Sequence, residues 1–241
     1  MIGTVLSQQE RRTEVARNLA AVQSRVSEAC ARCGRSADEV TVTVVTKFFP
    51  ASDVRLLADL GVTDVGENRH QEAEAKARET QDLDLRWHFV GGLQSNKAAA
   101  VARYADVVES VDRRKLLSGL AKGAHERGAL LDCLVQVSLD RPGAGRGRSG
   151  AAHDEVPALA EQVAATEGLR LRGVMGVAPL GGDPAEAFAR LAAVAEKVRL
   201  VDPAATWVSA GMSSDLEQAI EAGATHVRIG SAVLGRRPAI K

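Results

Sequence analysis

The chain has 241 residues, 45% of them hydrophobic and 26% charged, with 31 acidic and 31 basic side chains. This is the composition of an ordinary globular protein, long enough to build a sizeable core without disulfides or metals. A net charge of zero argues against nucleic acid or a membrane surface as partner, and no apolar run approaches the roughly 20 residues of a membrane helix.

Localisation and metal content are predicted from what the sequence lacks. Residues 1–12 carry no signal or transit pattern, so we expect a cytoplasmic protein. Cys30 and Cys33 have C-x-x-C spacing, but no second pair or histidine cluster completes a zinc site, and we expect free thiols and no metal. We interpret His88, beside Trp87, as a core histidine with a satisfied imidazole, and a contact with a cofactor is the alternative.

The first predicted element is a long N-terminal helix at residues 7–34. An apolar stripe with spacings of three and four runs along it: Val15, Leu19, Val22 and Val26. Gly34 then ends the helix, because glycine adopts the left-handed conformation common after a helix terminus.

After this helix, short runs of Val, Ile and Leu alternate with amphipathic stretches. The runs predict eight strands, at residues 40–46, 62–65, 86–90, 106–108, 132–139, 169–177, 206–209 and 225–229. Helices are expected between them at 53–60, 68–80, 95–104, 113–127, 153–166, 184–200 and 213–222. The alternation indicates parallel strands with crossover helices, and eight strands favour a closed (β/α)₈ TIM barrel. An open doubly wound sheet is the alternative.

These elements predict one α/β domain over residues 1–241, with the barrel at 40–235. The glycine-rich stretch at 141–150 is typical of a loop, and we find no linker that would divide the chain into domains.

Lys47 is the first candidate for a functional residue. The carboxyl ends of the strands form the active face of such a barrel, and alternation places Lys47 inward because the opposite face of its strand carries valines. Partial desolvation there lowers the pKa of a lysine and favours a neutral, nucleophilic amine. A lysine that reaches past the rim to water is the alternative.

The last two strands add a cation and an anion site. Alternation turns Arg228 inward, and two cations at one mouth call for an anion. Ser213 and Ser214 open a helix after the seventh strand, and Gly230 and Ser231 follow the eighth, which is the usual phosphate site of this fold. An amine opposite a phosphate site suggests a phosphorylated carbonyl compound held as a Schiff base. Pyridoxal 5′-phosphate (PLP) is the leading candidate, and a phospho-sugar aldolase is the alternative.

Six sequence strings occur in order and carry a family resemblance. They are V-V-T-K at 44–47, G-E-N at 66–68 with Q-E at 71–72, W-H-F-V-G-G-L-Q-S-N-K at 87–97, R-G-V-M at 172–175, G-M-S-S-D at 211–215 and V-R-I-G at 227–230. From about residue 41 to 235, the chain resembles the pyridoxal phosphate homeostasis proteins, the YggS/PROSC family. The resemblance implies a barrel like the N-terminal domain of alanine racemase that binds PLP without established turnover.

The resemblance also implies roles for individual residues. Lys47 holds PLP as a covalent aldimine. Arg228 approaches the pyridine nitrogen, and because arginine only donates hydrogen bonds, that nitrogen stays unprotonated and the ring is a poor electron sink. The phosphate is held by Ser213, Ser214, Gly230 and Ser231, and the pocket is lined by Asn68 and Met175.

Three positions depart from the family pattern. Phe49 stands where members often carry a second lysine, Arg69 stands where an aromatic residue usually follows G-E-N, and Val65 stands where an aromatic residue usually precedes it. These departures leave open which residues stack at the edge of the pocket and recognise a partner. They also leave open which residue, if any, replaces the second lysine in cofactor transfer or alternative attachment.

The sequence favours a carrier over an enzyme. A racemase needs a second acid or base opposite the lysine, and tyrosine fills that role in the related enzymes. The single tyrosine, Tyr104, precedes the fourth strand, so we expect it at the lower end of the barrel, about 15 Å from Lys47. We therefore predict no catalytic residue and a monomeric PLP carrier and buffer that supplies apo forms of PLP enzymes. A PLP-dependent enzyme with weak racemase-like activity is the alternative.

Overall fold

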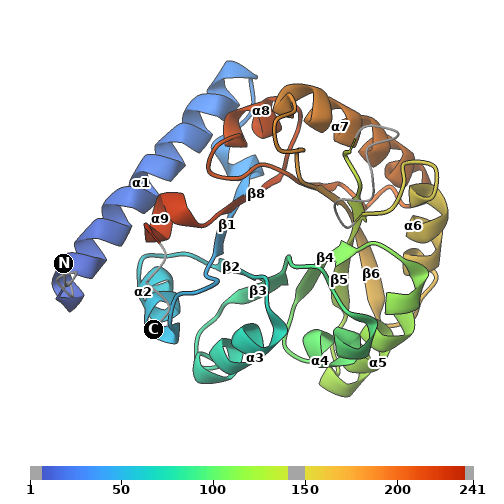
Figure 1. Ribbon diagram of the computed structural model, residues 1–241, viewed down its shortest axis with the longest axis horizontal. Helices are drawn as coiled ribbons and strands as arrows, with labels where there is room; N and C mark the ends of the chain where they lie inside the picture. Colours follow the sequence, from blue (N-terminus) through green and yellow to red (C-terminus); the bar gives the residue numbers. More distant parts are fainter. Residues whose placement is uncertain (1–6, 141–149, 237–241) are drawn as a thin grey trace.

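The computed structural model describes residues 7–140 and 150–236, and its strands form a closed parallel barrel in sequence order (Figure 1). The strands are β1 (Thr41–Val45), β2 (Asp64–Glu67), β3 (Arg86–Phe89), β4 (Val107–Val111), β5 (Leu131–Val137), β6 (Leu169–Gly176), β7 (Trp207–Ser209) and β8 (His226–Ile229). β8 pairs with β1, with Thr43 opposite Arg228, and this pairing closes the barrel. The predicted TIM barrel is confirmed, and the open sheet is excluded.

Helices surround the barrel and connect its strands. They are α1 (Gln8–Arg32), α2 (Ala51–Asp59), α3 (His70–Glu79), α4 (Ala98–Ala102), α5 (Leu117–Arg127), α6 (Val156–Ala164), α7 (Pro184–Val201), α8 (Leu216–Glu221) and α9 (Ser231–Leu234). Short 3₁₀ helices lie at Ala37–Glu39, Ser95–Lys97 and Arg114–Leu116. No helix in the described part of the chain is both long and apolar enough to cross a membrane. All but the last residue of the predicted loop at 141–150 lie outside the described residues.

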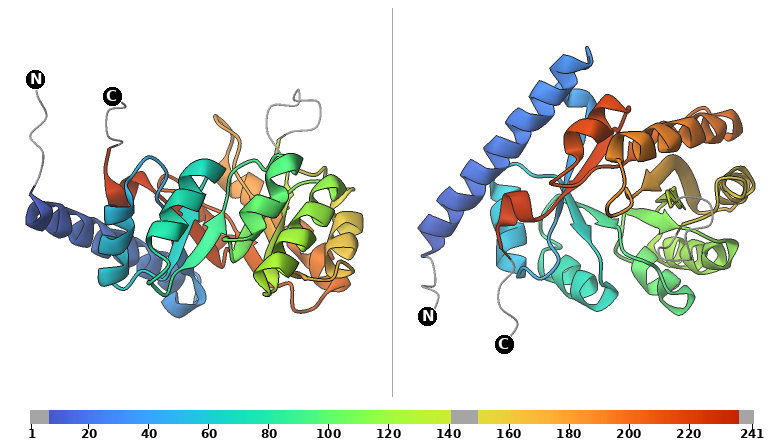
Figure 2. Two further views of the ribbon diagram at one scale, coloured as in Figure 1. Left: turned by 90° about the horizontal axis from the view of Figure 1, so that it is seen from below. Right: turned by 45° about the horizontal axis from the view of Figure 1, so that its top comes forward.

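The N-terminal helix α1 lies along the outside of the barrel, against α8 and α9 (Figure 2). A capping box between Ser7 and Glu10 begins it, and its predicted apolar stripe is buried. The stripe packs in one cluster with Val44 of β1 and with Val227 and Ile229 of β8. The faces of β1 and β8 that were predicted to point outward therefore do so, and Lys47 and Arg228 belong to the opposite, inward face.

Two strands extend beyond their predicted ends because polar residues continue them. β4 continues through Glu109 and Ser110, and β2 ends on Gly66 and Glu67, whereas the prediction followed apolar residues alone. All four residues are buried, so these polar groups lie within the structure rather than in loops. The predicted helices at 95–104 and 113–127 instead begin with the 3₁₀ turns, a common start for a helix.

Candidate functional site

A cavity of about 510 Å³ opens at the carboxyl ends of the strands. This volume lies within the roughly 300–1,000 Å³ of typical small-molecule sites. Its described lining residues are Val45, Lys47, Phe49, Asn68, Val90, Val177, Met212, Ser213, Ser214, Arg228, Gly230, Ser231 and Gly235. Lys47 and Arg228 are the ionisable side chains among them.

Seven of the eight residues predicted to bind a cofactor line this cavity: Lys47, Asn68, Ser213, Ser214, Arg228, Gly230 and Ser231. Met175 does not line it. Its side chain is 1% exposed and packs with Val107 and Leu134 in the barrel interior. Val177, two residues further along the same inward face, lines the cavity instead, because the inward position after Met175 lies one pleat nearer the mouth.

Lys47 stands in a tight turn between β1 and α2. The Phe49 amide donates to the Thr46 carbonyl at 3.0 Å, which closes the turn. Phe48 has a φ of +73°, in the left-handed region that residues with a Cβ seldom adopt. Its amide donates to the Glu72 carboxylate at 2.5 Å, so helix α3 holds this backbone from outside the cavity.

The serine turn between β7 and α8 forms another part of the wall. Gly211 begins it with a φ of +89°, and a Cβ there would lie 2.6 Å from the Cβ of Ala219, so glycine is required. The Met212 amide then donates to the Asp215 carboxylate at 2.6 Å. From α1, Arg25 donates to the carbonyl of Ser213 at 3.0 Å, so the N-terminal helix also supports this wall.

Gly230 and Ser231 lie next to β1 at the same mouth. A Cβ on Gly230 would stand 3.3 Å from the carbonyl oxygen of Val45, a tighter contact than side chains usually make. Because Gly230 has no side chain, it lines the cavity with its backbone, and Ser213 and Ser214 of the other turn also line it. Hydroxyl groups and backbone amides are the donors that commonly bind phosphate.

Arg228 forms part of the cavity floor and is held on its protein side. Its guanidinium donates to the Ser209 hydroxyl at 2.6 Å and to the Gly176 carbonyl at 2.8 Å, and lies 3.7 Å from Glu109. Burial lowers the pKa of Arg228 from its usual range, but a guanidinium remains charged at any physiological pH. The cavity floor is thus cationic and offers hydrogen-bond donors.

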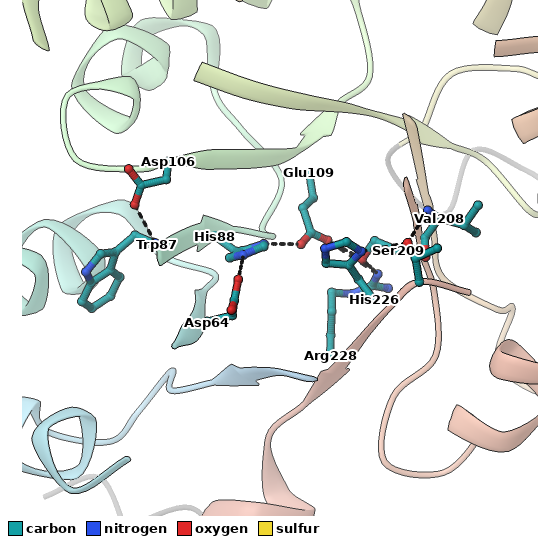
Figure 3. Close-up of polar contacts among 10 residues, drawn as sticks. Asp64, Trp87, His88, Asp106, Glu109, Val208, Ser209, His226 and Arg228 are labelled. Carbon is teal, nitrogen blue, oxygen red and sulfur yellow. Dashed lines mark hydrogen bonds and ion pairs between the residues drawn. The ribbon is translucent and has the colours of Figure 1, made fainter. Parts of the chain in front are cut away.

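Behind Arg228, charged side chains continue through the barrel interior, and we call Asp64, His88, Glu109 and Arg228 the inner network (Figure 3). The imidazole of His88 lies between Asp64, at 2.9 Å, and Glu109, at 2.8 Å. Glu109 also accepts a hydrogen bond from Ser209 at 2.6 Å. Positive and negative groups alternate along this line, so each charge has an opposite neighbour.

The inner network shifts the pKa values of its members. Burial disfavours the charged form of His88, but hydrogen bonds to Asp64 and Glu109 outweigh it and raise the pKa of His88 to about 9. Burial also disfavours ionised Glu109, yet contact with His88 and Arg228 lowers the pKa of Glu109 to about 2. His88 is therefore an imidazolium and Glu109 a carboxylate at neutral pH. The imidazole is satisfied, as the sequence predicts, and His88 is not among the lining residues.

Tyr104 lies in the outer helix layer. Its ring stacks on His70 of α3 with 5.9 Å between ring centroids, and burial raises the pKa of its hydroxyl. It is not among the residues that line the cavity. The described lining thus has no tyrosine opposite Lys47.

Two of the residues that depart from the family pattern, Phe49 and Arg69, lie at the Lys47 turn. Phe49 belongs to the turn, and Arg69 contacts Phe48 within it. Phe49 is 6% exposed, and the Arg11 guanidinium of α1 lies 5.6 Å from its ring centroid. The Arg69 guanidinium lies 5.0 Å from the ring centroid of Phe48. Arginine–aromatic contacts therefore occupy both sides of this turn.

Comparisons with known proteins agree on the fold of the chain and on a family to which it is similar in sequence. Residues 17–238 match the family model of the alanine racemase N-terminal domain. A pyridoxal phosphate homeostasis protein of Mycobacterium tuberculosis is 42% identical over 95% of both chains. The structure of PipY from Synechococcus elongatus with PLP bound is 33% identical, with a TM-score of 0.79 over 92% of this chain and 100% of its own. An alanine racemase from Corynebacterium glutamicum shares the fold, with a TM-score of 0.65 and 15% identity over 95% of this chain and 64% of its own.

Proposed function

Because the chain belongs to the pyridoxal phosphate homeostasis protein family, we propose that it binds PLP in the cavity at the barrel mouth and acts in PLP homeostasis as a carrier and buffer. One observation carries this proposal. Lys47 shares the cavity with the serine turn at 213–214, with Gly230 and Ser231, and with a cationic floor. An amine, an anion site and a ring-sized space are what a phosphorylated aldehyde requires.

The residues present fit PLP by size and by chemistry. The cavity of about 510 Å³ lies within the usual range for small ligands, of roughly 300–1,000 Å³. Gly230 lines the cavity and has no side chain, so a phosphate can approach the main chain there. Val45, Val90 and Val177 provide apolar walls for a flat ring. PLP, when bound, supplies an aldehyde for covalent attachment and an electron-withdrawing ring.

Each polar residue then has a distinct task. Lys47 would hold PLP covalently through its amine. Ser213, Ser214 and the backbone at 230–231 would hold the phosphate, and Asn68 stands at the rim. Arg228 would face the ring nitrogen as a hydrogen-bond donor that keeps its own protons, so this nitrogen would remain an unprotonated acceptor.

We propose a carrier rather than an enzyme because the described lining of the cavity offers no second acid or base. Among its described lining residues, the ionisable ones are Lys47 and Arg228, and Arg228 cannot exchange a proton with substrate. The recipients of PLP would be apo forms of PLP enzymes, and we expect the carrier to be a monomer. Its cysteines are free, in keeping with a reducing compartment such as the cytoplasm.

Absorption spectroscopy followed by reduction tests the binding proposal. Purified protein is mixed with PLP, its visible spectrum is recorded, and borohydride then fixes any adduct for peptide mass analysis. We expect a yellow protein and a reduced adduct on Lys47, with both lost in Lys47→Ala. Lys115→Ala, which changes a lysine outside the cavity, serves as the matched control and should behave like the wild type. An adduct on another lysine would contradict the assignment.

Deuterium exchange tests the carrier against the enzyme. Amino acids are incubated with the PLP-loaded protein in deuterated water, and label at the α-carbon is measured by mass spectrometry. We expect no more label than free PLP produces at the same concentration. Label well above that level would establish catalysis at the α-carbon and reject a pure carrier.

A further inference from the structure

A second set of charged residues lies beside the cavity, where α3 packs against the end of β2, and we call Glu67, Glu72 and Lys76 the outer cluster. Lys76 Nζ donates to Glu67 at 2.6 Å, to Glu72 at 2.7 Å and to the Thr46 carbonyl at 2.8 Å. The side chains of Lys76 and Glu67 are 7% and 1% exposed. An ammonium group has three donors, and these three acceptors use all of them. None of the outer cluster lines the cavity.

The outer cluster holds both peptide groups that flank Lys47. Lys76 binds the Thr46 carbonyl, which belongs to the peptide group before Lys47. Glu72 accepts from the Phe48 amide at 2.5 Å, which belongs to the peptide group after it. Two fixed peptide planes determine the φ and ψ angles between them, and thereby the direction in which the Lys47 side chain leaves the backbone.

The backbone conformation of Phe48 explains why its amide needs the hydrogen bond to Glu72. A non-glycine residue with a φ of +73° is strained, and such strain persists only where surrounding contacts fix the backbone. A hydrogen bond from an amide to a carboxylate is charge-assisted and stronger than one between neutral groups. Glu67 anchors the arrangement, because it also accepts a hydrogen bond from the Thr46 hydroxyl at 2.7 Å.

We propose that Glu72 and Lys76 are positioning residues for Lys47, which hold its turn so that Nζ meets the PLP aldehyde in a reactive geometry. The inference rests on the proposed function, since it concerns the rate of covalent attachment. Neither Glu72 nor Lys76 is expected to contact PLP, because neither lines the cavity. Their effect passes through the backbone of residues 46–48.

The test separates covalent attachment from non-covalent binding. For the wild type and Glu72→Ala, stopped-flow absorbance gives the rate constant of PLP attachment. Titration with pyridoxine 5′-phosphate, which carries the ring and phosphate but no aldehyde, gives the affinity without attachment. We expect Glu72→Ala to slow attachment on the order of 10- to 100-fold, as misplaced reacting groups do, and to keep pyridoxine phosphate affinity within about twofold. An unchanged attachment rate, or an equal loss of rate and affinity, would overturn the proposal.

Further variants distinguish positioning from general destabilisation. Glu72→Gln keeps an oxygen that can accept from the Phe48 amide, so it should recover most of the lost rate. Asp132→Asn is the matched control, because it removes a buried carboxylate charge that pairs with Arg170 on another side of the barrel. It should lower stability without slowing attachment, and an equal slowing would count against the proposal. If the wild type itself forms no adduct, the proposed function fails instead.

Discussion

The inner network and the outer cluster are both buried sets of charges beside one cavity, but they act on it differently. The inner network reaches the cavity through the side chain of Arg228, whose donors are oriented by Ser209 and Gly176. The outer cluster reaches no lining side chain and holds only the backbone on either side of Lys47. The planar guanidinium of Arg228 is thus oriented by its own hydrogen-bond partners. A flexible lysine that must react is oriented instead through the backbone on either side of it.

The carboxylates of the two sets also differ in how much water reaches them, and therefore in the stability lost when one is removed. The side chains of both carboxylates around His88 are buried, at 11% exposure for Asp64 and 1% for Glu109. In the outer cluster the Glu72 side chain is 25% exposed, so water shares in solvating it. Removing the charge of Glu109 should therefore cost more unfolding free energy than removing that of Glu72.

Replacing Glu109 should have the largest effect on stability. Glu109→Gln keeps the size of the side chain but leaves the His88 imidazolium and the Arg228 guanidinium without the anion between them. Breaking a buried pair in this way costs about 3–5 kcal/mol of unfolding free energy. Urea denaturation measures it, with Glu72→Gln as the comparison from the outer cluster. Equal losses in the two variants would remove the distinction between the sets.

The pH dependence of stability is the next largest effect, and it follows from His88. Its pKa is about 9 in the folded protein against an ordinary 6.5, so the folded state keeps a proton that the unfolded state releases. The resulting stabilisation is complete below pH 6.5 and is lost as the pH rises through 9. It amounts to about 3 kcal/mol.

Urea denaturation at several pH values between 6 and 10 measures this loss. His88→Gln provides the control, because it lacks the titrating imidazole, and its stability should fall less over the same range. Parallel curves for the two proteins would show that His88 does not hold its proton.

Much of the fold could be predicted because it depends on patterns that are local in sequence. The alternation of apolar runs gave the strand order, and the parity of β1 and β8 placed Lys47 and Arg228 inside. The inner network was missed because Glu109 interrupts an apolar run, which is ordinarily a sign that a strand has ended. Val107 and Glu109 lie two positions apart and therefore on the same face of a strand. This spacing was the available signal that the strand continues to Glu109.

The outer cluster could not be predicted in the same way. Lys76 lies in a helix with many charged residues, and lysines of such helices are ordinarily exposed, so its sequence neighbours give no sign of burial. Its burial depends on how α3 packs against β2 and the turn after β1, which is a tertiary feature. Glu67 and Glu72 occur in the family strings, but their shared partner became evident only from the distances to Lys76.

Restoring the lysine that the family often carries should have an intermediate effect. Phe49 is buried, and Arg11 next to its ring already pairs with Asp53 at 2.9 Å. Phe49→Lys loses buried apolar area and adds a second cation, which we expect to lower the unfolding free energy by about 2 kcal/mol. Thermal or urea denaturation checks this, with Phe49→Leu as the apolar control. An undiminished stability would mean that the turn depends on the outer cluster alone and not on packing against α1.

The smallest effect is expected from Arg69, and it tests how the Lys47 turn is held. Its guanidinium lies 5.0 Å from the centroid of the Phe48 ring, and such contacts contribute about 0.5–1 kcal/mol. Arg69→Ala should therefore change stability little and leave the PLP attachment rate at the wild-type value, because the Phe48 amide stays bound to Glu72. Arg69→Lys keeps the cation and serves as the control. If Arg69→Ala slowed attachment as much as Glu72→Ala, the ring of Phe48 and not its backbone would be the part that positions Lys47.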